Sequence, residues 1–198
     1  MGNGHNYILN QGLIFNVTLA FFKRSFLMEN NLKFLNYTIA EDFLFFTSVL
    51  LLNPAIISTS YNIYRYIVHE NSITTTRSSK QAQKCVHDYL SVMKNIQQQL
   101  SNINDKAQSI YNIYTKAMNL NSFYIYKKIL IANYSTSTYT SIINEFKKAK
   151  LLPIIHTGTN LKCIIGYSII NILTYIPILY KPTSFIYNRI LAKYILKL

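Results

Sequence analysis

Residues 37–52 read YTIAEDFLFFTSVLLL, and an adjacent pair of acids, Glu41 and Asp42, precedes the apolar run of this stretch. Acidic side chains in a first turn suit the positive end of a helix dipole, and Pro54 cannot continue a helix. We therefore predict a helix that begins near Glu41 and ends before Pro54. The whole chain has only seven acids, and a carboxylate among apolar side chains is costly unless it has a partner or a chemical task.

Short apolar runs and helical segments alternate on both sides of this helix. Polar segments with spaced apolar residues predict helices at residues 3–10, before Gly12, and at residues 23–30. Runs rich in β-branched or aromatic residues predict strands at residues 13–17, 55–59 and 61–68. Because strands that alternate with helices are typical of α/β proteins, we predict an α/β domain over residues 1–80.

The rest of the chain is predicted to be helical. In residues 81–150 apolar side chains recur at every third or fourth position, which predicts an α-helical extension. Residues 151–198 are basic, aromatic and aliphatic, and within them residues 163–180 carry no charge over a length close to that of a bilayer. Three interpretations stay open for this uncharged stretch: a membrane span, an amphipathic helix that lies in the membrane interface, and ordinary packing.

The chain is strongly basic, with 20 Lys and Arg against seven acids and a net charge of +13. This charge favours an anionic partner such as a phosphate-rich lipid surface, a nucleotide or a nucleic acid, although biased codon usage would also produce it. Without the dense basic run of a nucleic-acid-binding arm, we expect no nucleic-acid partner. Cys85 and Cys163 imply no disulfide framework, and Met1 is not followed by a secretory signal. We expect a cytoplasmic protein, peripheral at the anionic inner face of the cell membrane.

Three segments together suggest a family. Residues 22–34 read FKRSFLMENNLKF, residues 37–52 follow with the acidic pair, and residues 63–74 read IYRYIVHENSIT. In order, spacing and residue type they resemble the latter half of the catalytic domain of bacterial family 2 glycosyltransferases, over about residues 10 to 80. The resemblance implies that residues 1–80 are the C-terminal part of a nucleotide-diphospho-sugar transferase (GT-A) domain. It also implies transfer of a sugar, with inversion, from a nucleotide-sugar donor to a saccharide or lipid-linked acceptor in surface polysaccharide synthesis.

The resemblance assigns roles to the two adjacent acids. It implies that Asp42 is the base that deprotonates the acceptor hydroxyl, a group that is a poor nucleophile until its proton is taken up. Glu41 would orient the acceptor or increase the basicity of Asp42. The structural alternative is an ordinary helix start, with Thr38 as its cap and the two acids in its first turn.

The resemblance also implies a binding site for the donor diphosphate. His69 occupies the basic position before Asn-Ser-Ile and would lie near the diphosphate or its divalent metal, Mg²⁺ or Mn²⁺, where it would stabilise the leaving group or bind the metal. Arg65, Lys23 and Arg24 would contact phosphates in the same way. The alternatives are a loop histidine without a role and ordinary solvated surface charges.

The metal-binding Asp-X-Asp motif of the family is missing, because the three aspartates of the sequence are Asp42, Asp88 and Asp105. We therefore expect a truncated or split enzyme, inactive by itself, that binds nucleotide sugar poorly unless a partner chain supplies the missing half. A different class of protein is the alternative: a non-catalytic, basic, membrane-associated protein whose residues 151–198 bind anionic lipid.

Overall fold

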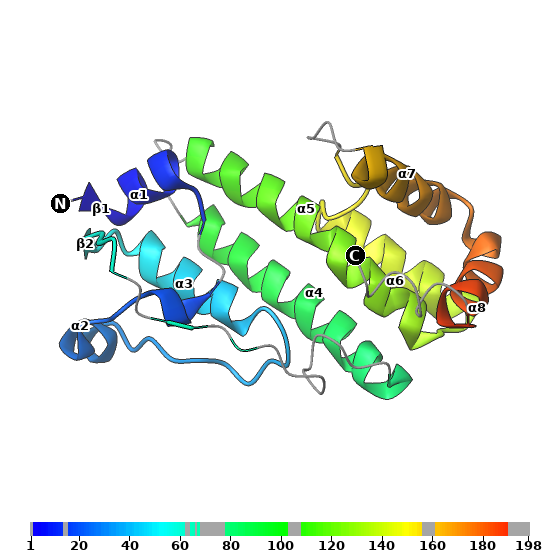
Figure 1. Cartoon of the computed structure of the whole chain (residues 1–198), viewed down its shortest axis with the longest axis horizontal. Coiled ribbons are helices and arrows are strands. Elements are labelled where there is room, and N and C mark those ends of the chain that lie inside the picture. Colours follow the sequence, from blue (N-terminus) through cyan, green and yellow to red (C-terminus); the bar gives the residue numbers. More distant parts are fainter. Residues whose placement is uncertain are drawn as a thin grey trace. The chain divides into compact units, whose positions relative to one another are not determined.

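The computed structural model describes residues 2–13, 16–61, 64, 65, 67, 78–102, 108–155 and 161–189, and helices make up 72% of them (Figure 1). The helices are α1 Gly4–Gln11, η1 Val17–Leu19, α2 Arg24–Glu29, α3 Glu41–Leu51, α4 Ser79–Ser101, α5 Gln108–Ala132, α6 Thr136–Lys148, α7 Leu161–Tyr175, η3 Pro177–Leu179 and α8 Tyr180–Arg189. The described strands are β1 Gly2–Asn3 and β2 Ala55–Ile56, which pair antiparallel with Gly2 opposite Ile56.

The prediction of an α/β domain, and with it of a GT-A fold, was wrong, because the described residues are mostly helical and contain a single two-stranded sheet. Of residues 55–59 only Ala55 and Ile56 form a strand. Val17 begins the short helix η1 instead of ending a strand, because the Asn16 side chain accepts a hydrogen bond from the Thr18 N–H at 2.9 Å. Such local bonds compete with sheet pairing. Residues 14 and 15, and residues 62, 63, 66 and 68 of the stretch 61–68, lie outside the described part.

The helices predicted in the first 54 residues are confirmed. Helix α1 begins where the Asn3 side chain accepts a hydrogen bond from the Asn6 N–H, at 2.9 Å. It ends at Gly12, whose φ of 81° is a conformation that favours glycine. Helix α3 begins at Glu41 and ends three residues before Pro54, as the acids and the proline predict.

The chain divides into two compact units. Unit 1 comprises Met1–Thr74 and Ser91–Tyr114, and unit 2 comprises Thr75–Leu90 and Thr115–Leu198, so that α4 and α5 each contribute residues to both. The core of unit 1 is built around α3, in which seven residues are buried. Ile8 of α1 is fully buried, and the ring of Phe43 on α3 stacks on Tyr114 at a centroid distance of 5.9 Å.

Hydroxyl groups of buried tyrosines join the helices of unit 2. The Tyr139 hydroxyl on α6 donates to the Leu173 carbonyl on α7 at 3.0 Å and lies 2.5 Å from the Tyr126 hydroxyl on α5. The ring of Tyr180 on α8 stacks on Tyr139 at 4.0 Å, and its hydroxyl donates to the Ile129 carbonyl at 2.9 Å. These bonds satisfy polar groups that would be costly to bury alone, and they connect α5, α6, α7 and α8.

A second polar connection in unit 2 holds the segment between α6 and α7. The Asn119 side chain on α5 donates to the Pro153 carbonyl at 2.8 Å and accepts from the Ile155 N–H at 2.7 Å. Asn171 on α7 makes a reciprocal pair with Ile154, accepting at 2.8 Å and donating at 3.0 Å. Side-chain amides therefore replace regular backbone pairing in this extended segment.

Within the described part of the chain, no one helix has both the length and the apolar composition needed to cross a bilayer. The stretches Cys163–Tyr175 and Pro177–Arg189 meet these criteria only as a pair, and the pair is bent by 114°.

The close approach of α1 to the end of α3 makes a first prediction. A Cβ atom at Gly4 would lie 2.5 Å from the Leu50 carbonyl oxygen and 3.2 Å from the Asn53 Cα, both of which are backbone atoms, whereas nothing lies within 4 Å of a Cβ at Gly2. We expect Gly4→Ala to lower the free energy of unfolding by about 1–3 kcal/mol through overpacking, and Gly2→Ala to change it little. Urea unfolding of both variants measures the difference, and equal effects would contradict this packing.

The buried tyrosines predict loss of stability at high pH. Burial raises the pKa of Tyr139 to about 12 from its ordinary value of 10. The unfolded chain thus loses this proton near pH 10, before the folded chain does, so stability that is complete below about pH 10 falls as the pH approaches about 12. We expect Tyr139→Phe to reduce this slope in urea unfolding, and Tyr124→Phe, at an exposed position, to leave it unchanged.

Candidate functional site

The two predicted catalytic acids lie in the first turn of α3, and both side chains are half-buried. Asp42 accepts a hydrogen bond through Oδ2 from the Val17 N–H of η1, at 3.4 Å. This bond is long for its type, but it connects the start of α3 to a segment 25 residues earlier in the chain. Asp42 is therefore held by a group outside its own helix.

The start of α3 differs from the alternative of an ordinary capped helix. Its N-cap residue is Ala40 instead of Thr38, and no side-chain hydrogen bond caps the helix among the described residues. Ala40 has φ 62° and ψ 13°, in the left-handed region that residues with a Cβ rarely adopt. Strained backbone of this kind is found disproportionately at functional sites. The strain directly precedes the acidic pair.

A pocket of about 630 Å³ lies in unit 1 beside α3. Aromatic side chains dominate its lining: Tyr7, Phe21, Phe22, Phe26, Phe46, Tyr61 and Tyr64. Lys23, Ser58 and Thr59 add polar groups to the wall. This combination of an apolar surface with a few polar groups is typical of small-molecule sites.

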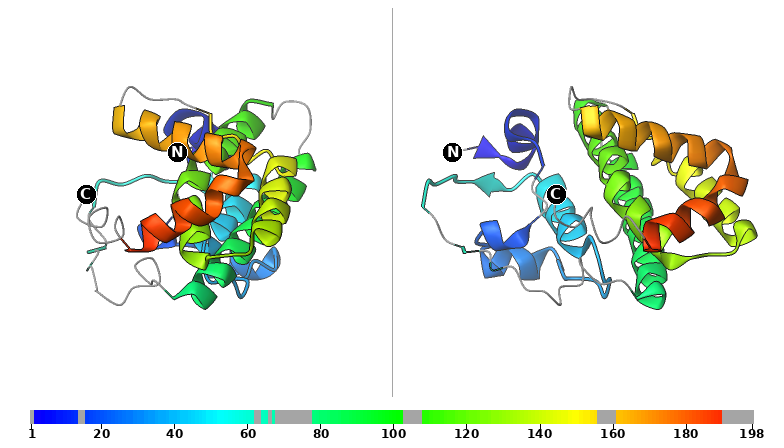
Figure 2. Two further views of the ribbon diagram at one scale, coloured as in Figure 1. Left: turned by 90° about the vertical axis from the view of Figure 1, so that its right-hand side faces the viewer. Right: turned by 45° about the vertical axis from the view of Figure 1, so that its right-hand side comes forward.

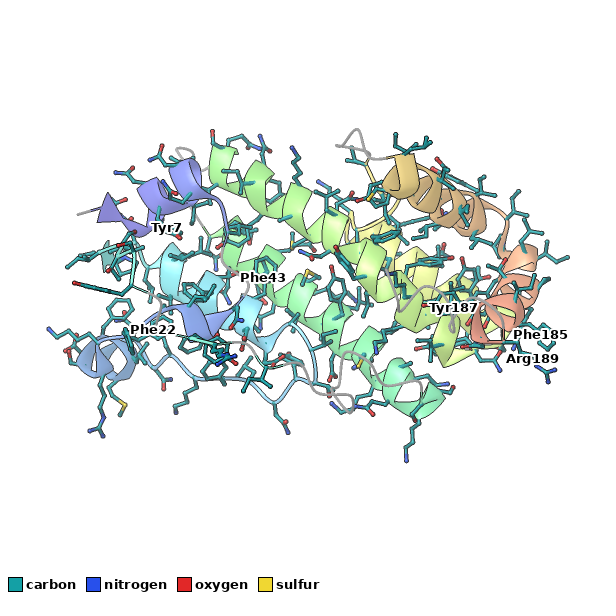
Figure 3. All side chains as sticks on the ribbon, in the orientation of Figure 1. Tyr7, Phe22, Phe43, Phe185, Tyr187 and Arg189 are labelled. Atoms are coloured by element: carbon teal, nitrogen blue, oxygen red, sulfur yellow. The ribbon has the colours of Figure 1, made fainter. Side chains whose placement is uncertain are left out.

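Ring contacts make the wall around Phe22 rigid. Phe22 meets the edges of Phe45 and Phe46, with centroid distances of 5.4 and 5.5 Å, and Phe34 stacks on Phe45 at 4.2 Å. Both arrangements are favourable for aromatic pairs. Tyr7 and Phe22, which come from α1 and from the segment before α2, are labelled in Figure 3. The lining is thus assembled from separate segments around α3.

Helix α3 carries the acid and one wall of the pocket on the same face. Asp42 is followed at intervals of four, seven and eight residues by Phe46, Val49 and Leu50, all three of which line the pocket. Residues at these intervals share a face of an α-helix, and neighbours four apart have Cβ atoms about 5–6 Å from each other. Asp42 therefore lies about one helical turn from the pocket lining.

A second connection between Asp42 and the pocket runs along the chain. Val17, which donates to Asp42, is followed within two residues by the pocket-lining segment from Leu19 to Lys23. The acid and the pocket thus share both a helix and a loop.

The structure brings some of the predicted donor-site residues to the pocket and leaves others away from it. Lys23 lines the pocket as the exposed N-cap residue of α2, and the exposed Arg24 follows it in the first turn. Arg65 is exposed and lies outside the described lining, while His69 is not among the described residues. No three His, Cys, Asp or Glu side chains within the described ranges gather closely enough to hold a metal ion.

The aromatic lining was missed in the sequence interpretation. A signal was present, because the chain has 17 Tyr and 11 Phe residues and no Trp, a large aromatic content. The lining residues are nevertheless scattered between Tyr7 and Tyr64. Composition gives no indication of which aromatic side chains share a wall.

Comparison with known proteins identifies no relatives: no family model, no curated protein and no solved structure matches the chain.

The contact between Asp42 and Val17 predicts different effects for two substitutions. Asp42→Ala removes the acceptor of the Val17 N–H bond and a negative charge from the first turn of α3, so it should lower the free energy of unfolding by about 1–2 kcal/mol. Asp42→Asn keeps an oxygen that accepts the bond and should cost about half as much. Urea unfolding compares the two, and an Asn variant as unstable as the Ala variant would show that the bond contributes nothing.

Proposed function

We propose that unit 1 is the acceptor-binding and base-bearing part of a glycosyl-transfer site. The observation that carries this proposal is the shared face of α3, on which Asp42 lies about one turn from the pocket-lining Phe46. In the proposed step the Asp42 carboxylate takes the proton of an acceptor hydroxyl while the hydroxyl oxygen attacks the anomeric carbon of the donor sugar. The bond from that carbon to the nucleoside diphosphate breaks, and its electron pair leaves with the phosphate oxygen.

The environment of Asp42 suits a general base. The Val17 N–H holds Oδ2, so we assign the transferred proton to Oδ1. The side chain is half-buried, which limits the water that would compete with the acceptor hydroxyl. Glu41, the neighbouring half-buried acid, is proposed to accept a hydrogen bond from a second hydroxyl of the acceptor and so to orient it.

The pocket suits a saccharide. A pyranose ring has apolar C–H faces and a polar edge of hydroxyl groups, while tyrosine offers an apolar ring with a polar tip. Tyr7, Tyr61 and Tyr64 are placed in the lining together with the hydroxyls of Ser58 and Thr59. The volume of about 630 Å³ lies within the usual range for small ligands.

Lys23 suits an acceptor that carries phosphate. Its ammonium group is the cation of the described lining, and lysine binds phosphate as a compact point charge. A saccharide linked to a lipid through a diphosphate would present sugar to the aromatic wall and phosphate to Lys23. A lipid-linked acceptor is therefore the class that we favour.

Binding of the nucleotide-sugar donor requires more residues than the acceptor pocket contains. Arg24, Arg65 and His69 are proposed to contact the donor diphosphate, as the resemblance implies. The aspartates of the sequence, Asp42, Asp88 and Asp105, form no Asp-X-Asp pair, so the metal-bound nucleotide site is proposed to come from another chain or from sequence outside these 198 residues.

The acceptor site predicts saccharide binding by the chain alone. Titration with methyl glycosides and disaccharides, followed by saturation-transfer NMR, should show binding that Tyr61→Ala weakens about three- to tenfold, the value of one aromatic contact. Tyr61 is 81% exposed, so its truncation should not disturb the core. The control is Tyr124→Ala, at an exposed site in unit 2. Equal weakening by both variants, or no binding by any saccharide of the panel, would argue against an acceptor pocket.

The donor side and the base are tested separately. Labelled uridine and guanosine diphosphate sugars with Mg²⁺ should not bind the chain at micromolar concentration, and metal-dependent binding in that range would show a complete donor site within it. The base is tested in a preparation that turns over substrate once a nucleotide-binding chain has been added. In that preparation, Asp42→Asn should lower kcat by about 10²–10⁴-fold while saccharide binding is retained. Glu29→Gln, which removes an exposed acid of unit 1, is the charge-matched control.

A further inference from the structure

Helix α7 is largely apolar, with one side covered by unit 2 and another side exposed. Large apolar side chains that are 46–68% exposed recur along it: Leu161, Ile165, Ile169, Ile172, Tyr175 and, just after the helix, Ile176. At 3.6 residues per turn these positions fall within roughly a third of the helix circumference. The open side of α7 is thus a mostly apolar stripe, which also contains the exposed Ser168.

The opposite side of α7 is fixed to unit 2. Leu173 is buried, and its carbonyl accepts the Tyr139 hydroxyl at 3.0 Å, while Asn171 pairs with Ile154. A Cβ atom at Gly166 would lie 2.9 Å from the ring of Phe123, so the helix approaches α5 closely. These contacts place the Leu173 side of α7 against unit 2 and leave the stripe on the open side.

The exposed apolar surface continues past the end of α7. Ile178 and Leu179 on η3 and Phe185 and Ile186 on α8 are 40–75% exposed. Both views of Figure 2 show α7 meeting α8 at a sharp turn. In Figure 3, Phe185 and Arg189 lie on the outer side of α8, and Tyr187, which is buried, lies on its inner side. We call the exposed apolar residues of α7, η3 and α8 the apolar face.

The part of the sequence that carries the apolar face is rich in cations. The sequence after Glu145 contains no acid and eight Lys and Arg residues: 147, 148, 150, 162, 181, 189, 193 and 197. Among the described ones, the Lys147 ammonium lies 4.7 Å from the ring centre of Tyr175, and the Arg189 guanidinium lies 4.8 Å from that of Phe185. Cations are therefore held directly against aromatic rings of the apolar face. This arrangement is typical of surfaces that insert apolar groups below a layer of lipid phosphates.

We propose that the apolar face is a docking surface for an anionic membrane, with α7 and α8 lying in the interface. The cations would pair with lipid phosphates while the isoleucines enter the acyl boundary. A second copy of the chain fits less well, because a two-fold interface places the same patch opposite itself and would bring Lys147 and Arg189 close to their own copies. This proposal does not depend on the glycosyl-transfer function.

Vesicle flotation of the whole chain tests the proposal. We expect binding to phosphatidylcholine vesicles that contain phosphatidylglycerol at least about tenfold stronger than to phosphatidylcholine alone. The triple variant Ile165→Gln, Ile169→Gln, Ile172→Gln should weaken this binding at least about tenfold. The matched control Leu9→Gln, Met28→Gln, Leu52→Gln removes side chains of similar exposure, 47–70%, from unit 1. It should change binding less than about twofold. Circular dichroism checks that both variants keep their helices.

Single tryptophans locate the contact, because the chain has none of its own. Ile169→Trp should emit at shorter wavelength when anionic vesicles are added and be quenched by brominated lipid, whereas Met28→Trp should do neither. Lys181→Gln with Arg189→Gln should weaken binding more than Lys33→Gln with Lys116→Gln, two other exposed cations.

Three results would overturn the proposal. The first is absence of binding to anionic vesicles, and the second is a triple glutamine variant that binds as well as the original chain. The third is self-association, measured by light scattering, that the triple variant abolishes while no vesicle binding is seen. That result would assign the face to a second copy.

Discussion

Unit 1 depends on the burial of α3, a helix of eleven residues of which seven are buried. A helix this short is unstable in water without tertiary packing, and one so apolar has to be covered on most of its sides. Ile8 on α1 and Tyr114 on α5 supply parts of the cover, and Phe22 and Phe34 supply another. The cover leaves Asp42 at the half-buried end of the helix. The position of the acid therefore follows from the way the helix is buried.

The sequence predicted individual helices correctly, but its prediction of the fold class was wrong. Helix starts and ends depend on residues only a few positions away: acids in the first turn, a proline after the last turn, and Gly12 at the end of α1. The bounds of α1 and α3 were therefore predicted closely. A strand needs a partner, and the partner of Ala55 is Asn3, more than fifty residues away. Residues with high β-propensity, such as those around Ile56, also pack well against helices. Propensity alone therefore led to an α/β prediction for a mostly helical chain.

The acids of the candidate site could be predicted from the sequence, but the residues that line its pocket could not. Glu41 and Asp42 could be singled out because acids are scarce in this chain, and the structure places both at the start of α3. The contact of Asp42 with Val17 could not be foreseen, because Val17 was predicted to end a strand and instead begins η1. The lining of the pocket depends on how Tyr7, Phe22 and Tyr61 come together around α3. That is tertiary information, which periodicity does not contain.

Helices α3 and α7 are both rich in apolar residues, but they are covered to different extents. Both are composed mostly of apolar residues, so water is a poor solvent for either. In α3 the core of unit 1 covers the helix, whereas in α7 the tyrosine and asparagine contacts of unit 2 cover one side and leave Ile165, Ile169 and Ile172 exposed. Burying three such side chains is worth several kcal/mol at roughly 25 cal/mol per Å². Selection for solubility alone would favour polar residues at these positions. Exposed apolar residues on this helix, with cations held against its aromatic rings, therefore indicate a surface whose preferred neighbour is both anionic and apolar, which is the chemistry of a lipid headgroup layer.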